Sequence, residues 1–166
     1  MGGGITGATV AVFASRTITI GTTAISAEDT LSITVGSGTA QVITFKSGTG
    51  TNSSTFSTNA ANVYIGNAVG TGAQIANQLA EAVEVLIDSI SNITATHADE
   101  DGIITVTADT AQTTTYDLTI ETIADANQIS IGTATAGVTG VDGTDSTTFT
   151  LAVSYTHLTL PTKRIV

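Results

Sequence analysis

The sequence predicts an α+β fold: a mostly antiparallel sheet with one amphipathic helix, at about residues 72–90, packed on it. Short runs of alternating apolar and polar residues, typical of half-buried strands, lie on both sides of a single helical pattern. Strands and helices do not alternate along the chain, as they would in an α/β fold. Threonine, a β-branched residue that favours pleated surfaces, fills about a fifth of the positions.

A hairpin over residues 30–46 begins the clearest part of the predicted sheet. Residues 31–35 alternate between apolar and polar side chains, Gly36-Ser37-Gly38 supplies a turn, and residues 41–46 form the returning strand. The polar stretch 47–60 that follows predicts an exposed loop, fastened to the body by Phe56. Further short strands are predicted at residues 17–20, 62–66, 93–97, 103–108, 116–120 and 128–131.

One helix is predicted because apolar side chains recur every three or four residues between Gly72 and Ile90. Thr71 is the expected N-cap, and Gln74, three residues on, completes the pattern of a capping box. The apolar stripe comprises Ile75, Leu79, Val83, Leu86 and Ile90. We therefore expect this stripe to pack on the sheet.

The charge balance excludes several classes of partner. Residues 1–152 contain all 14 acidic residues of the chain and two of its four basic ones, Arg16 and Lys46. Phosphate recognition needs lysine and arginine, so we expect neither a nucleic acid nor a membrane as partner. No run is long and apolar enough to span a bilayer. Cysteine is absent, which excludes disulfides, thiolate ligands and cysteine nucleophiles.

The last residues resemble something other than a folded domain. Val153-Ser154-Tyr155-Thr156-His157-Leu158-Thr159-Leu160-Pro161-Thr162 is similar to the translated read-through of a transposase-type sequencing-library adapter. Lys163 and Arg164, the other two basic residues, and Pro161, the single proline, also lie in this stretch. The resemblance implies that residues 153–166 are non-native, that they pack poorly, and that the native gene continues past Ala152.

The chain therefore divides into four predicted parts. Residues 1–16 are the end of a preceding module or a linker, and residues 17–132 are an α+β module. Residues 133–152 are a linker or the start of a next module, and residues 153–166 are the adapter-like tail.

Two acidic clusters are weak calcium candidates, because hard cations prefer oxygen ligands. Asp99 and Asp101 flank Glu100 beside Gly102, and Asp142 and Asp145 lie in a glycine-rich stretch. Neither spacing matches an EF-hand loop. A solvated hairpin turn and a flexible linker are the favoured interpretations of the two clusters.

Catalytic patterns are also weak, so we expect no enzyme and no cofactor. His97 precedes the adapter-like tail and has no second histidine or cysteine to form a metal site, so it is expected to be a partly exposed strand residue. Glu81, Glu84 and Asp88 share a helical face, which is more commonly a solvated face than an acid–base pair.

The middle of the chain resembles a module of tailed-bacteriophage virion proteins. The resemblance is carried by residues 43–50 (ITFKSGTG), residues 61–83 with Asn62-Val63-x-Ile65-Gly66 and an alanine-rich helix, and residues 102–110 (GIITVTADT). Such modules occur as insertions or repeats in tail-sheath, baseplate and tail-fibre proteins, and in some bacterial surface proteins. The family brings no catalytic residues.

The resemblance implies a structural role in assembly or surface display in a phage tail, first in the sheath and otherwise in a fibre or baseplate. The implied partners are other virion subunits in a homo-oligomer, and the implied location is the virion. Two alternatives remain. One is a bacterial adhesin or surface-layer repeat at the cell surface, and the other is a non-catalytic appendage of a larger enzyme.

Overall fold

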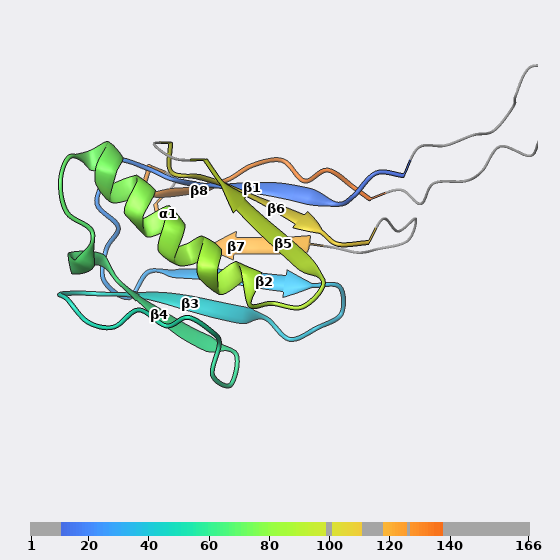
Figure 1. Ribbon diagram of the computed structural model, residues 1–166, viewed down its shortest axis with the longest axis horizontal. Coiled ribbons are helices and arrows are strands. Elements are labelled where there is room, and N and C mark those ends of the chain that lie inside the picture. Colours follow the sequence, from blue (N-terminus) through green and yellow to red (C-terminus); the bar gives the residue numbers. More distant parts are fainter. Residues whose placement is uncertain (1–10, 99–100, 111–117, 126, 138–166) are drawn as a thin grey trace, which may run out of the picture.

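A computed structural model describes residues 11–98, 101–110, 118–125 and 127–137, and it confirms the α+β class. Along the described chain, four strands precede the α-helix and four follow it (Figure 1). The elements are β1 (Ser15–Ile20), β2 (Thr30–Val35), β3 (Gln41–Lys46), β4 (Ala60–Tyr64), the 3₁₀ turn η1 (Ile65–Asn67), α1 (Gly72–Asp88), β5 (Ile93–His97), β6 (Ile103–Ala108), β7 (Leu118–Thr122) and β8 (Ile129–Ile131).

The strands form two four-stranded sheets, ordered β5-β6-β1-β8 and β4-β3-β2-β7. Every ladder is antiparallel except that between β3 and β4, so the expectation of a mostly antiparallel arrangement is confirmed. The predicted hairpin is present as β2 and β3, with Leu31 opposite Ile43. Figure 1 shows α1 lying obliquely across the strands.

A single core joins both sheets to the helix. From the sheets it receives Ile18, Ile104, Leu31 and Phe45, all fully buried. The helix contributes the buried residues Ala76, Leu79, Ala80, Val83, Leu86 and Ile87. Because burial of a leucine-sized side chain is worth about 1.5–3 kcal/mol, this helical stripe is a main stabilising element of the fold.

Threonines lie on the opposite face of the first sheet. Thr105 on β6 stands between Thr17 on β1 and Thr96 on β5, in register across three strands. The residues next to it, Ile104 and Val106, are buried. These strands thus alternate between core and hydroxyl-bearing positions.

The helix begins as the sequence predicts. The Thr71 hydroxyl accepts a hydrogen bond from the Gln74 backbone N–H at 3.4 Å, and Gln74 Oε1 accepts one from the Thr71 N–H at 2.8 Å. This reciprocal pair is a capping box.

The stretch between β3 and β4 is a mostly exposed loop, as predicted, and it also pairs with a strand. It runs back along the free edge of β4, where the Ser53 N–H donates to the Asn62 carbonyl at 2.9 Å and the Asn52 carboxamide oxygen accepts from the Tyr64 N–H at 2.8 Å. Phe56 packs against the core, as expected. The edge of β4 is therefore covered by the chain's own loop.

Gly66 of the Asn-Val-x-Ile-Gly pattern lies where two backbone segments approach closely. Its N–H donates to the Gly48 carbonyl at 2.9 Å, and an added Cβ would lie 2.5 Å from that oxygen. Only glycine fits at this contact without a shift of the backbone.

We predict that Leu79→Asp unfolds the module, because Leu79 is 3% exposed and burying an unpaired charge costs several kcal/mol. Val85→Asp is the matched control, since Val85 lies on the same helix and is 49% exposed. Thermal melting by circular dichroism distinguishes the two variants. An unchanged melting temperature for Leu79→Asp would show that this helical face is not the core face.

A second prediction concerns the two-residue turn between Ser57 and Ala60. Thr58 and Asn59 both have positive φ, 49° and 65°, as in a type I′ turn. A β-branched residue is strained in that region, by about 1 kcal/mol or more. We expect Thr58→Asn to raise the unfolding free energy by about 1 kcal/mol in chemical denaturation. Thr51→Asn, in the same loop without positive φ, should have little effect.

Candidate functional site

The acidic turn after β5 is the first place to examine for a cation site. Asp101 Oδ1 accepts a hydrogen bond from the Ile103 N–H at 2.9 Å, so this carboxylate closes the turn before β6. Gly102, with a φ of 64°, accepts from the Ile20 N–H at 2.9 Å and ties the turn to the end of β1. Within the described residues, no three histidine or acidic side chains come together as a metal site would require.

The other calcium candidates cannot be placed. Asp99, Asp142 and Asp145 lie outside the described residues, as do Glu100 and the adapter-like stretch 153–166. The calcium interpretation of these residues stays a prediction.

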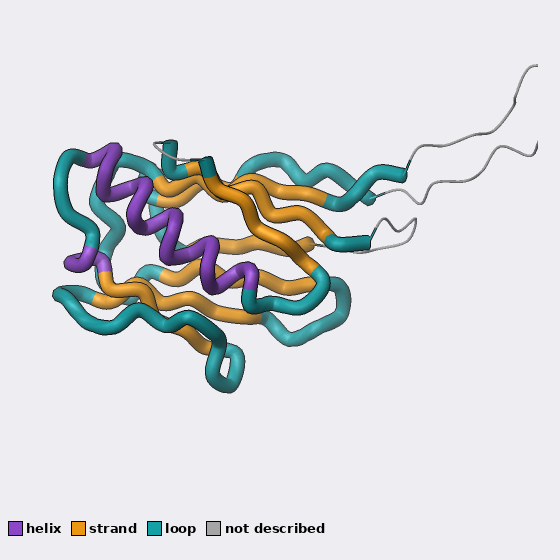
Figure 2. Tube along the Cα trace, viewed as in Figure 1, coloured by secondary structure: helices purple, strands orange, loops and turns teal. Residues whose placement is uncertain are grey.

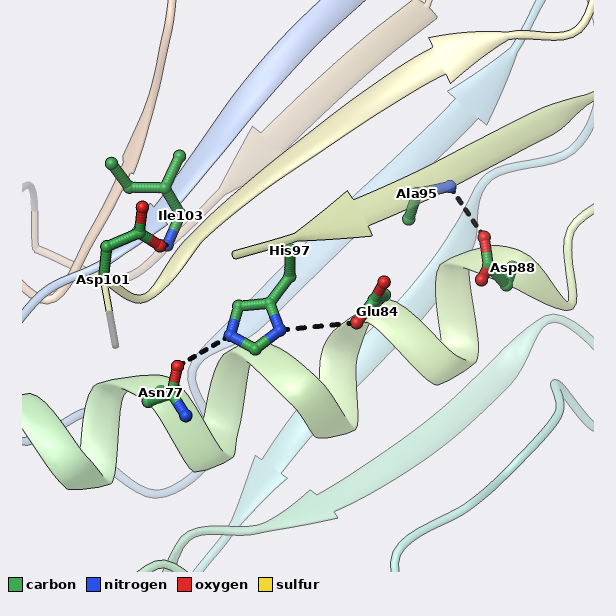
Figure 3. A network of polar contacts seen from close by, with 7 residues as sticks. All are labelled: Asn77, Glu84, Asp88, Ala95, His97, Asp101 and Ile103. Atoms are coloured by element: carbon green, nitrogen blue, oxygen red, sulfur yellow. Dashed lines mark hydrogen bonds and ion pairs between the residues drawn. The ribbon is translucent and has the colours of Figure 1, made fainter. Parts of the chain in front are cut away.

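His97 forms the best-defined polar cluster of the described structure, between β5 and α1 (Figure 3). Its Nε2 lies 2.8 Å from Asn77 Oδ1, and its Nδ1 lies 3.4 Å from Glu84 Oε2. As expected, His97 is a strand residue of intermediate exposure, but its side chain is largely covered, at 5% exposed.

The strand period explains why the imidazole is buried. Ile93, Ala95 and His97 alternate along β5 on one face, and His97 stands opposite the buried Ile104 of β6. Asn77 and Glu84 are seven residues apart, which places them two turns apart on one side of α1. The alternation was visible in the sequence, whereas the two helical partners depend on how α1 lies over β5.

The acidic face of α1 is solvated as expected at Glu81 and Asp88, which are exposed, and is partly covered at Glu84. Two of its carboxylates also make contacts with β5: Glu84 contacts His97, and Asp88 Oδ1 accepts from the Ala95 N–H at 2.6 Å (Figure 3). This backbone N–H lies on the side of β5 away from β6. Asp88 therefore satisfies one backbone N–H of β5, an edge strand of its sheet.

The His97 cluster fastens the helix to the sheet and has no arrangement for nucleophilic catalysis. Nucleophilic catalysis needs a hydroxyl or thiol beside one ring nitrogen. The contacts of the ring within the described chain are instead the amide of Asn77 and the carboxylate of Glu84.

The chain enters and leaves the module at adjacent positions. Ser15, at the start of β1, and Thr135, after β8, exchange two backbone hydrogen bonds of 3.0 and 2.9 Å. Figure 2 shows the first and last parts of the described chain on the same side of the molecule. We call this paired segment, formed by residues 15 and 135, the stem.

Arg16 reinforces the stem and closes the seam between the two sheets. Its Nε donates to the Gly132 carbonyl at 3.3 Å and its Nη1 to the Ile120 carbonyl of β7 at 3.4 Å. Arg16, one of the few basic residues of the chain, thus donates hydrogen bonds to a carbonyl of β7 and to the carbonyl of the residue that follows β8.

Comparison with protein-family models, with curated proteins and with solved structures gives no match for this chain. In the described residues no helix is long and apolar enough to cross a membrane.

We predict that His97→Ala lowers the unfolding free energy by about 1–3 kcal/mol, because it removes the hydrogen bond to Asn77 and the contact with Glu84 and leaves a space where the imidazole was. Equilibrium urea denaturation measures the change. Thr96→Ala, the neighbouring residue on the opposite face of β5, is the matched control and should cost much less. Equal losses for the two variants would argue against a stabilising role for the cluster.

Proposed function

We propose that residues 17–132 form a structural display module of a tailed-phage virion protein, carried as an outward insertion in a tail protein. The sheath is the first candidate for the host protein, and a fibre or baseplate protein is the second. The resemblance in residues 43–50, 61–83 and 102–110 supports the phage assignment. The stem supports the insertion.

The stem is the main support for the insertion, because it brings together the points at which the chain enters and leaves the module. An inserted domain must leave its host at one point and return close to it, and paired ends allow this without distorting the host. In a tandem array, by contrast, a module connects most simply to its two neighbours when its N- and C-terminal ends lie on opposite sides. The hydrogen bonds between Ser15 and Thr135 therefore favour an insertion over a tandem surface-layer repeat.

The covered strand edges suit a module present at high local copy number. The loop at Asn52 and Ser53 covers β4, Asp88 satisfies an N–H of β5, and Arg16 satisfies a carbonyl of β7. Open edges recruit strands from other molecules and cause aggregation. Acidic side chains and surface hydroxyls further favour solubility.

The insertion is tested by grafting residues 12–136 into a surface loop of an unrelated monomeric carrier. We expect the carrier and the graft each to keep their separate melting temperatures, because the stem closes the graft. The matched control carries Ser15→Pro in the graft, which removes the N–H donated to Thr135. Misfolding of the carrier with the unmodified graft would contradict the insertion model.

The virion assignment is tested separately, with antibodies raised against the isolated chain. We expect immunogold labelling of tails in particles purified from a host that carries the gene. Labelling of the bacterial envelope in place of particles would favour the adhesin alternative. Turnover of a glycan by the isolated chain would overturn the non-catalytic role.

A further inference from the structure

A pocket of about 410 Å³ opens at the end of the molecule where three connections meet. These are the β2–β3 turn, the long β3–β4 loop and the α1–β5 turn (Figures 1 and 2). Its size lies within the range of small-ligand sites, about 300–1,000 Å³. None of the residues of the His97 cluster lines it.

One side of the pocket is apolar. Val35, Phe56 and Ile90 line it, and each is partly buried and packs against the core. Their positions are therefore fixed by the fold. Phe56 offers an aromatic surface, whose electron-rich face attracts the weakly positive C–H groups of a ring-shaped ligand.

The rest of the lining is rich in neutral hydrogen-bonding groups: four serine and threonine residues and two amides. The Gln41 amide is held in place, because Nε2 donates to the Thr39 carbonyl at 3.3 Å and to Asn59 Oδ1 at 2.8 Å. Both amide hydrogens are thereby used, which leaves Oε1 as an acceptor of fixed orientation.

Further donors and acceptors of the lining are available to a ligand. Across the described parts of the chain, no hydrogen bond joins the side chains of Thr55, Ser91 or Asn92 to another residue. These groups can both donate and accept, as hydroxyl-rich ligands require.

The electrostatic character of the pocket favours a neutral ligand over an anion. None of the lining residues is ionisable, and the pocket lies at the C-terminal end of α1, beside Ser89. Carbonyls at a helix C-terminus carry partial negative charge and disfavour anions. Phosphates, nucleotides and uronic acids are therefore poor candidates, whereas neutral hydroxyl donors fit.

We propose that this pocket is a binding site for a neutral saccharide, with one sugar ring against Phe56 and its hydroxyls on the amides and hydroxyls opposite. This proposal does not depend on the display role, and it can be tested on the isolated chain. Its failure would leave the insertion model untouched.

The test is an NMR titration of the ¹⁵N-labelled full chain with glucose, galactose and N-acetylglucosamine, and with a neutral oligosaccharide of each. We expect saturable shifts of the amides of Gln41, Phe56 and Asn92 for at least one neutral sugar. Glucuronate should bind at least about tenfold more weakly, because the partial negative charge at the helix C-terminus disfavours a carboxylate in this pocket. If the oligosaccharide binds more tightly than its monosaccharide, the natural ligand is a polymer. If the two bind equally, the natural ligand is a free sugar.

Variants separate binding from folding. Phe56→Leu keeps an apolar side chain but removes the ring, and we expect affinity to fall by about tenfold. Thr55→Val removes one hydroxyl from an exposed loop position and should weaken binding without changing the melting temperature. Gln78→Ala, at a helix position outside this pocket, is the matched control and should bind as the wild type does.

Three results would overturn the proposal. They are no saturable shift with any of the neutral sugars while the chain is folded, shifts centred away from the three connections, and equal binding of glucuronate.

Discussion

The structure depends on the apolar stripe of α1, which is the element that both sheets share. Leu79, Val83 and Leu86 are buried in one core with side chains from β1 and β6 of one sheet and β2 and β3 of the other. The helix contacts β1, β5 and β6 of one sheet and β4 of the other, so that burial of a single stripe stabilises the whole module.

Around that core, a few polar contacts define how the elements meet. His97 and Asp88 hold β5 against the helix, and Arg16 links β7 to the residue that follows β8. Asp88 accepts from a backbone N–H of β5, and Arg16 donates to two backbone carbonyls. Three of the chain's charged or titratable side chains thus serve to join its elements.

The stem and the pocket have separate roles in the two proposals. The stem at Ser15 and Thr135 fixes where a host protein would hold the module, and the pocket beside Phe56 gives it a surface to present. The edge of β4, which could otherwise recruit a strand from another molecule, is covered by the chain's own loop.

The local sequence pattern was sufficient to predict which segments form the helix and the strands. The spacing of Leu79, Val83 and Leu86, the capping pair Thr71 and Gln74, and the alternation through β2 and β3 determined which segments form the helix and strands. These features depend on interactions within a few residues, so they can be read from the chain. Only the tertiary structure decided the division into two sheets, the parallel pairing of β3 with β4, the burial of His97, the stem and the pocket. Each of these joins residues that are distant in the chain, as Arg16 and Gly132 are, and no local periodicity carries information about such contacts.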